Sequence, residues 1–81
     1  MSAKAITIGK WLYIEHRESF GQRLRRIRKE KGYSQVQLAD KIGVPSHYIC
    51  DYEKERFHPN LAMLEWLCEA LDITATELLG F

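Results

Sequence analysis

The sequence predicts an all-α domain, a bundle of five short helices with short connections, preceded by an N-terminal extension. Three observations predict this class. A serine, threonine or asparagine suited to cap a helix precedes four of the five predicted helices. Apolar side chains recur at intervals of three and four residues, which is the period of an amphipathic helix. Glycines stand where three of the helices would end.

Length and composition fit one small domain. The chain has 81 residues, of which 46% are hydrophobic and 11% aromatic, and these fractions favour a packed core over disorder. No apolar run has the length of a membrane span or the pattern of a signal peptide. The two cysteines, Cys50 and Cys68, are too few for a disulfide framework. We therefore expect a cytoplasmic protein.

Charge is distributed unevenly along the chain. The net charge is only +1, but residues 1–56 hold all twelve lysines and arginines against seven acidic residues. Residues 57–81 hold four acidic residues and no basic one. Such a chain can present a basic face to phosphate and an acidic face elsewhere. The alternative is an ordinary solvated surface on which the charges compensate one another.

The first predicted helix covers about residues 20–31. Ser19 and Gln22 have the spacing of a capping box, in which each side chain bonds the other residue's backbone amide. Gly32 follows at the end of the apolar pattern, where a left-handed residue commonly terminates a helix. This helix carries several of the basic residues.

The second and third predicted helices, about residues 35–42 and 45–54, form a helix-turn-helix. Ser34 and Gln37 make a second capping box, and Gly43 stands where the chain must turn sharply. Pro45 suits the first turn of the next helix. The third helix would then turn two apolar side chains inward and leave four residues facing out: Ser46, His47, Cys50 and Asp51. A helix exposed in this way is shaped to enter a DNA major groove.

The fourth and fifth predicted helices follow a loop closed by Pro59. Asn60 caps the fourth helix, and Thr74 with Glu77 makes a third capping box for the fifth, which Gly80 ends. The fourth helix carries a predicted apolar stripe of Leu61, Leu64, Leu67 and Leu71.

The extension, residues 1–19, is harder to interpret because β-branched and aromatic residues alternate only partly there. It fits an extended arm, an edge strand or an irregular helix, and we favour the arm or strand.

Residues 20–79 resemble the lambda-repressor-like (Cro/repressor, XRE-type) family of helix-turn-helix transcriptional regulators. The matching pieces are the SQ-xx-LA opening of the second helix, the Gly43-Val44 turn, Ile49, Tyr52-Glu53, Pro59 and the final Glu77-Leu78-Leu79. The resemblance implies a five-helix lambda-repressor-like DNA-binding domain at 20–81, with 1–19 outside it.

It implies a bacterial or phage protein of the nucleoid that binds double-stranded DNA sequence-specifically, as a homodimeric repressor on a near-palindromic operator. No enzyme activity, cofactor or small-molecule ligand is expected. The alternative function is a protein-interaction or bridging module with a degenerate helix-turn-helix.

The resemblance also implies roles for individual residues. Gln35 stands where the family binds phosphate, at a helix N-terminus that favours anions. The residues expected to contact phosphate are Gln35, Arg23, Lys54, Arg56, His58 and Asn60. The residues expected to read bases are Ser46, His47, Cys50 and Asp51. For Asp51, the alternative is a surface charge or an ion pair with Lys54 or a neighbour of Glu55.

Further expectations concern structure and assembly. Arg28 and Glu53 match family positions that form an ion pair. Surplus aromatic residues predict a dimer interface that includes Trp66, Phe81 and Trp11, or else an arm that folds back over Trp66 within one chain.

Two residues depart from the family pattern, namely Pro45 at a position that is usually serine and Glu55 at a position that is commonly glycine. His47 and Cys50 have the spacing of two metal ligands, but a groove-facing surface is the preferred interpretation and no metal is expected. Cys50 would be the more exposed of the two cysteines.

Overall fold

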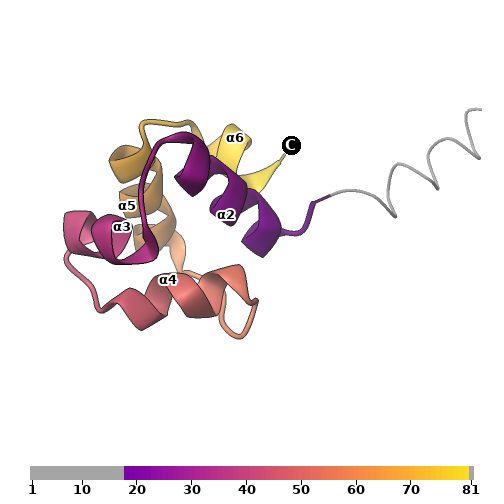
Figure 1. Ribbon diagram of the computed structural model, residues 1–81. Helices are drawn as coiled ribbons and strands as arrows, with labels where there is room; N and C mark the ends of the chain where they lie inside the picture. Colours follow the sequence, from indigo (N-terminus) through magenta and orange to yellow (C-terminus); the bar gives the residue numbers. More distant parts are fainter. Residues whose placement is uncertain (1–17, 81) are drawn as a thin grey trace, which may run out of the picture.

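The computed structural model describes residues 18–80, and within this range all regular secondary structure is helical, as predicted (Figure 1). The predicted arm or strand of the extension falls almost wholly outside the described residues. The described helices are α2 (Phe20–Glu30), α3 (Gln35–Ile42), α4 (Ser46–Glu53), α5 (Leu61–Leu71) and α6 (Ala75–Leu79). Within residues 18–80, no helix is both long enough and apolar enough to cross a membrane.

The three predicted capping boxes are all formed, which fixes where three of the helices begin. In each box the hydroxyl accepts a hydrogen bond from the backbone amide three residues on, and the side chain there bonds back to the cap residue's amide. The three pairs are Ser19 with Gln22, Ser34 with Gln37, and Thr74 with Glu77. Asn60 caps α5 as predicted, because its side-chain oxygen accepts from the Met63 amide at 2.8 Å.

Helix α4 begins differently from the prediction. Pro45 was expected inside the first turn, but it is the N-cap residue, with φ −61° and ψ 146°. Its extended ψ keeps it outside the helix, and its ring offers no acceptor for the amides of the first turn. Unlike the other described helices, α4 therefore starts without a side-chain cap.

The core lies where all five described helices meet. Six large side chains are almost completely buried: Leu24, Leu38, Ile49, Leu67, Leu71 and Leu78. The predicted leucine stripe of α5 is only partly correct, because Leu61 is 76% exposed while Met63 and Ala70 are buried. Leu61 opens the helix, and helical side chains tilt toward the N-terminus, so this side chain projects past the end of the packed surface.

Two close approaches position α4. Gly43 turns the chain between α3 and α4 with φ +90°, a conformation that glycine adopts without steric cost. Gly21 of α2 lies against the end of α4 so closely that a β-carbon there would overlap the backbone carbonyl of Glu53. Helix α4 is thus held from its inner side by α2 and α3.

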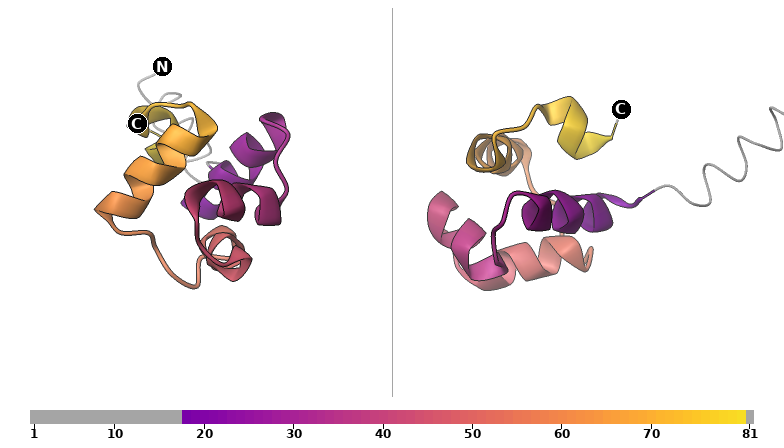
Figure 2. Two further views of the ribbon diagram at one scale, coloured as in Figure 1. Left: turned by 90° about the vertical axis from the view of Figure 1, so that its left-hand side faces the viewer. Right: turned by 45° about the horizontal axis from the view of Figure 1, so that its top comes forward.

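The arrangement has three levels. In the right-hand view of Figure 2, α4 lies on one side, α2 in the middle, and α5 with α6 on the opposite side. Residue contacts agree, because α4 packs chiefly on α3 and α2, whereas α6 packs on α2 and α5. The outer side of α4 is not covered by any other described helix.

Candidate nucleic-acid interface

The predicted base-reading residues lie together on the uncovered side of α4. Ser46 and His47 are exposed in its first turn. Cys50 and Asp51 follow one turn later and are partly buried. Inward-facing Ile49 and the buried Tyr52 anchor the opposite side of the helix in the core. The helix therefore presents a short polar surface on a fixed apolar base.

The end of α4 is tied to α2 by the ion pair expected between Arg28 and Glu53. The guanidinium Nε lies 2.6 Å from Glu53 Oε2, and Nη2 lies 3.1 Å from Oε1, so the pair is bidentate. Both side chains are buried, at 7% and 5% exposure. Arg28 Nη1 also donates to the Tyr33 carbonyl at 2.8 Å, which adds the α2–α3 connection to the same network.

Gln35 belongs to this network as well, which the sequence did not reveal. It is the first residue of α3, and its side-chain Nε2 donates to Glu53 Oε1 at 3.0 Å. The Glu53 carboxylate therefore receives hydrogen bonds from both Arg28 and Gln35. As a result, the start of α3 and the end of α4 are held in one fixed relation.

The connection after α4 carries three exposed basic or imidazole side chains, Lys54, Arg56 and His58. Glu55 lies between them with φ +61°, in the left-handed conformation that favours glycine. The departure from glycine at this position thus leaves the turn in a glycine-like backbone conformation. Asp51 forms an ion pair with Arg56, with Oδ1 and Nη1 3.4 Å apart, so it is bonded to a neighbour of Glu55.

Two of the residues expected to contact phosphate have structural roles instead of free side chains. Asn60 uses its side-chain oxygen to cap α5, which leaves only its amide nitrogen. Arg23 is buried, and its guanidinium donates to the carbonyls of Glu18 at 2.9 Å and Leu78 at 3.3 Å. Arg23 thus packs against the end of α6 and uses two of its guanidinium nitrogens within the domain.

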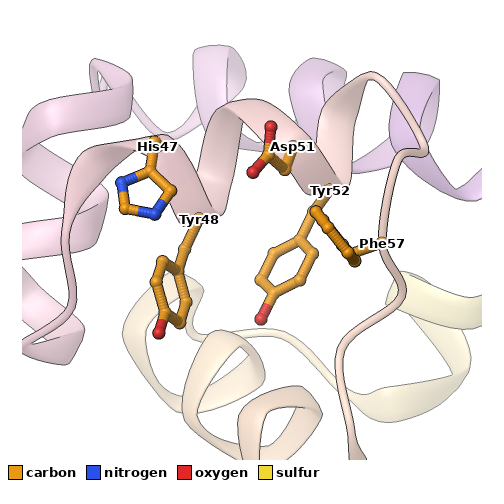
Figure 3. Close-up of a pocket in the computed structure, with 5 residues that line it drawn as sticks. All are labelled: His47, Tyr48, Asp51, Tyr52 and Phe57. Atoms are coloured by element: carbon orange, nitrogen blue, oxygen red, sulfur yellow. The ribbon is translucent and has the colours of Figure 1, made fainter.

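Sequence reasoning missed an aromatic hollow beside α4, shown in Figure 3. Its volume is about 380 Å³, and it is lined by His47, Tyr48, Asp51, Tyr52 and Phe57. Tyr48 stacks edge-on against both His47 and Tyr52, with ring centroids 5.0 Å and 6.4 Å apart. Burial and the nearby Tyr48 raise the pKa of Tyr52. Tyr48 and Tyr52 are four residues apart, and this spacing places two side chains next to each other on a helix surface, so it could have indicated an aromatic surface here.

The two cysteines fall in the same class of exposure. Cys50 and Cys68 are both free thiols and both partly buried. Burial, with a smaller effect from Glu77, raises the pKa of the Cys68 thiol and keeps it protonated at neutral pH. Among residues 18–80 no three histidine, cysteine or acidic side chains gather as a metal site would require.

Comparison with known proteins identifies the architecture. A family model described as a helix-turn-helix domain matches residues 21–80, which is most of the chain. The chain belongs to the XRE-type helix-turn-helix family.

Curated relatives of this XRE-type domain are repressors and regulators by name. The immunity repressor protein of Bacillus phage phi105 is 42% identical over 60 residues, which cover 74% of this chain and 42% of that protein. The regulator SinR of Bacillus subtilis is 40% identical over 60 residues, which cover 73% of this chain and 54% of that protein. The chain thus spans about half the length of the curated relatives it matches.

Two solved structures share the fold of this XRE-type domain. The restriction-modification controller protein C.AhdI from Aeromonas hydrophila superposes with a TM-score of 0.70 at 41% identity, over 73% of this chain and 89% of that one. SinR, described as the master regulator for biofilm formation and solved in complex with DNA, superposes with a TM-score of 0.71 at 39% identity. That match covers 75% of this chain and 98% of the SinR chain.

Proposed function

We propose that this protein is a transcriptional regulator that binds double-stranded DNA by inserting α4 into the major groove. The observation that carries the proposal is the uncovered side of α4, whose polar residues stand on a helix fixed by the Arg28–Glu53 pair. A structurally similar chain, SinR, has been solved in complex with DNA. A helix held in advance loses little freedom when it docks, so more of the contact energy remains for binding.

Phosphate contacts would set the position of the domain on DNA. The first amides of α3 lack intrahelical partners and lie at the positive end of the helix dipole, next to Gln35. Lys54, Arg56 and His58 lie on the connection that leaves the C-terminal end of α4, the end that Gln35 also contacts through Glu53. These groups would thus contact the DNA backbone beside the C-terminal end of the inserted helix and supply the salt-sensitive part of the affinity.

Base contacts would come from the outward residues of α4. Ser46 can donate or accept a hydrogen bond, and His47 can donate to a guanine edge. Asp51 can accept from a cytosine amine, and its bond to Arg56 offsets the repulsion that its carboxylate would otherwise feel from phosphate. Cys50, partly buried between these residues, supplies a small apolar contact.

The proposal includes a homodimer that represses transcription from a near-palindromic operator in a bacterial or phage cytoplasm. Two copies of α4 related by a two-fold axis would enter successive major grooves about 34 Å apart. Trp66 is 48% exposed, as a residue of a dimer surface would be. The other two residues expected there, Trp11 and Phe81, lie outside the described residues. The family is not one of enzymes, and no catalytic role is proposed.

Selection of duplexes from a random DNA pool at moderate salt tests this function. Enrichment of an inverted repeat is expected, and its half-site spacing would report the dimer geometry. Gln35→Ala should weaken binding to all sequences alike, whereas Ser46→Ala or His47→Ala should change the selected bases. Absence of binding even at low salt would overturn the proposal in favour of a protein-interaction module.

A further inference from the structure

An apolar groove runs between α5 and α6, on the side of the domain opposite α4. Its volume is about 460 Å³. Leu61 is 76% exposed and Leu79 is 37% exposed, so the groove leaves two large apolar side chains in solvent. A contiguous apolar surface of this kind marks a place where another segment binds. Its apolar lining is formed by Leu61, Leu64, Cys68, Ala75, Leu78 and Leu79.

The groove continues to the point where the described chain begins. A second hollow, of about 350 Å³, is lined by Glu18 and Arg23 and shares Leu64 and Leu79 with the groove. Arg23 fixes this junction, because one guanidinium donates to the carbonyls of both Glu18 and Leu78. The polypeptide that precedes Glu18 therefore starts beside the α5–α6 groove.

The chemistry of residues 1–17 complements the groove. This segment contains seven large apolar residues, three basic residues and one acidic residue. Glu65 and Glu69 line the groove, and none of its described lining residues is a lysine or arginine. The large apolar residues of the segment are Met1, Ile6, Ile8, Trp11, Leu12, Tyr13 and Ile14, and its basic residues are Lys4, Lys10 and Arg17.

The segment is also long enough. An extended chain spans at most about 3.3–3.6 Å per residue, so the seven steps from Glu18 back to Trp11 can cover roughly 23 Å. The wall of the groove from Leu61 to Cys68 rises only about 1.5 Å per residue along α5, or roughly 10 Å. The apolar residues around Trp11 can therefore reach every part of the groove from their own chain.

We propose that residues 1–17 bind in the α5–α6 groove of their own chain. The apolar residues around Trp11 and Leu12 cover Leu61 and Leu64, and the flanking basic residues face Glu65 and Glu69. Binding in this groove leaves Trp66 uncovered, since Trp66 lines a different hollow with Lys41 and Ile42, between α3 and α5. The segment therefore covers exposed apolar surface without touching the α4 side.

Tryptophan fluorescence of the full chain tests this placement. Trp66→Phe leaves Trp11 as the single tryptophan, and a bound segment gives it a short-wavelength emission that is protected from acrylamide quenching. Adding Leu61→Lys places a charge in the groove and is expected to shift the emission to longer wavelength with loss of protection. Val36→Lys is the matched control, because Val36 is a 55% exposed apolar residue on α3, outside the groove.

The alternatives give different results. An emission that is already solvent-exposed and that Leu61→Lys leaves unchanged would overturn the proposal. Protection that appears only as protein concentration rises would assign the groove to a second copy, and protection that appears only with added duplex would assign the segment to DNA. Neither the emission nor the quenching of the protein alone depends on DNA binding, so a failure of the proposed function would be seen separately.

Disulfide trapping provides a second measurement that leaves the groove residues intact. In a Cys50→Ser background, Leu12→Cys is expected to form an intramolecular disulfide with Cys68 of the groove when oxidised glutathione is added. Ser46→Cys in the same background is the control, because Ser46 lies on α4 and should stay unpaired with Cys68. Formation of only intermolecular disulfides, or of none, by the Leu12→Cys protein would overturn binding within one chain.

Discussion

The α4 side and the α5–α6 side of this domain hold their exposed side chains in different ways. On the α4 side, Arg28, Gln35 and Glu53 join three segments of the chain through one buried carboxylate. On the α5–α6 side, the described polar contacts are local helix caps, apart from the bond from Arg23 to the Leu78 carbonyl. The exposed residues there are apolar side chains, acidic side chains and two threonines, and none of them is basic.

This difference shows how one small fold supports two kinds of surface. A surface that reads a fixed pattern of donors and acceptors needs side chains whose positions are set before contact. A surface that is covered by an apolar segment needs exposed area and tolerates mobile side chains. The buried ion pair therefore lies on the side where side chains need fixed positions. The exposed leucines lie on the side where a binding segment needs apolar surface area.

Removing the Glu53 carboxylate, which Arg28 and Gln35 share, should cause the largest loss of stability of the changes considered for the two sides. Glu53→Ala leaves the Arg28 guanidinium buried without a counter-charge, and we expect the free energy of unfolding to fall by about 3–5 kcal/mol. Urea denaturation followed by circular dichroism measures this. Arg26→Ala, which removes an exposed pair with Glu18, is the control and should change stability far less. Equal effects of the two variants would contradict the special role of the buried pair.

Filling the close approach of α2 to α4 should have the next largest effect. Alanine favours a helix over glycine by about 1 kcal/mol, yet Gly21→Ala places a methyl group against the Glu53 carbonyl. Overpacking of this kind costs about 1–3 kcal/mol, so a net loss of stability is expected together with weaker DNA binding. Arg25→Ala, at an exposed site in α2, controls for helix propensity. If Gly21→Ala instead stabilised the protein, α2 and α4 would be able to move apart without loss of packing, and the prediction would be wrong.

A change on the outer side of α4 should alter sequence preference and leave stability unchanged. His47→Ala removes one base contact, and we expect a change of about 1–3 kcal/mol in discrimination at one operator position. Binding titrations with single-base operator variants measure it. Trp66→Ser, on α5, should leave the preferred bases unchanged. A shift in base preference caused by Trp66→Ser would contradict the division between the two sides.

The two described residues other than glycine that adopt the left-handed conformation offer a finer test, one on each side of the domain. Glu55 and Asp72 have φ of +61° and +57°. The left-handed region costs most residues about 1–2 kcal/mol, while glycine loses about 0.5–1 kcal/mol in backbone entropy, so Glu55→Gly should stabilise by roughly 0.5 kcal/mol. Aspartate tolerates this region better than glutamate, so Asp72→Gly should gain less. Thermal unfolding of both variants measures the difference.

The smallest expected effect is a pH dependence at α6. Hydrogen bonds from Thr74, the largest of them from its backbone amide, lower the pKa of Glu77 below its ordinary value. The stabilisation by this capping box is therefore complete above the ordinary glutamate pKa and is lost as the pH falls through the lowered one. Glu77→Gln keeps a capping oxygen without a charge, so its urea midpoint should change less between about pH 6 and about pH 3. Identical pH profiles for both proteins would contradict this.

Local rules accounted for most of the fold in advance. Capping boxes and turn glycines depend on residues three or four positions apart, and these were read correctly from Ser19 to Gly80. The four residues predicted to read bases also lie together on α4, because the buried side of this short helix is apolar.

What the sequence did not show depends on contacts between distant segments. The role of Arg23 follows from a carbonyl 55 residues away, and the bond between Gln35 and Glu53 spans 18 residues. The exposure of Leu61 depends on what covers the start of α5, which a periodic pattern does not specify. Tyr48 and Phe57 were missed because their hollow joins a helix to a loop whose path was unknown.

The contacts of Arg23 also have a topological consequence. Because Glu18 and Leu78 share one guanidinium, the two ends of the described chain lie side by side, next to the start of α2 (Figure 1). A short linker could then join these ends and new termini could be opened in the exposed connection between α4 and α5. Domains with adjacent ends tolerate circular permutation. We therefore expect the helices to pack in the same way, with α4 exposed as before, when their order along the chain is changed.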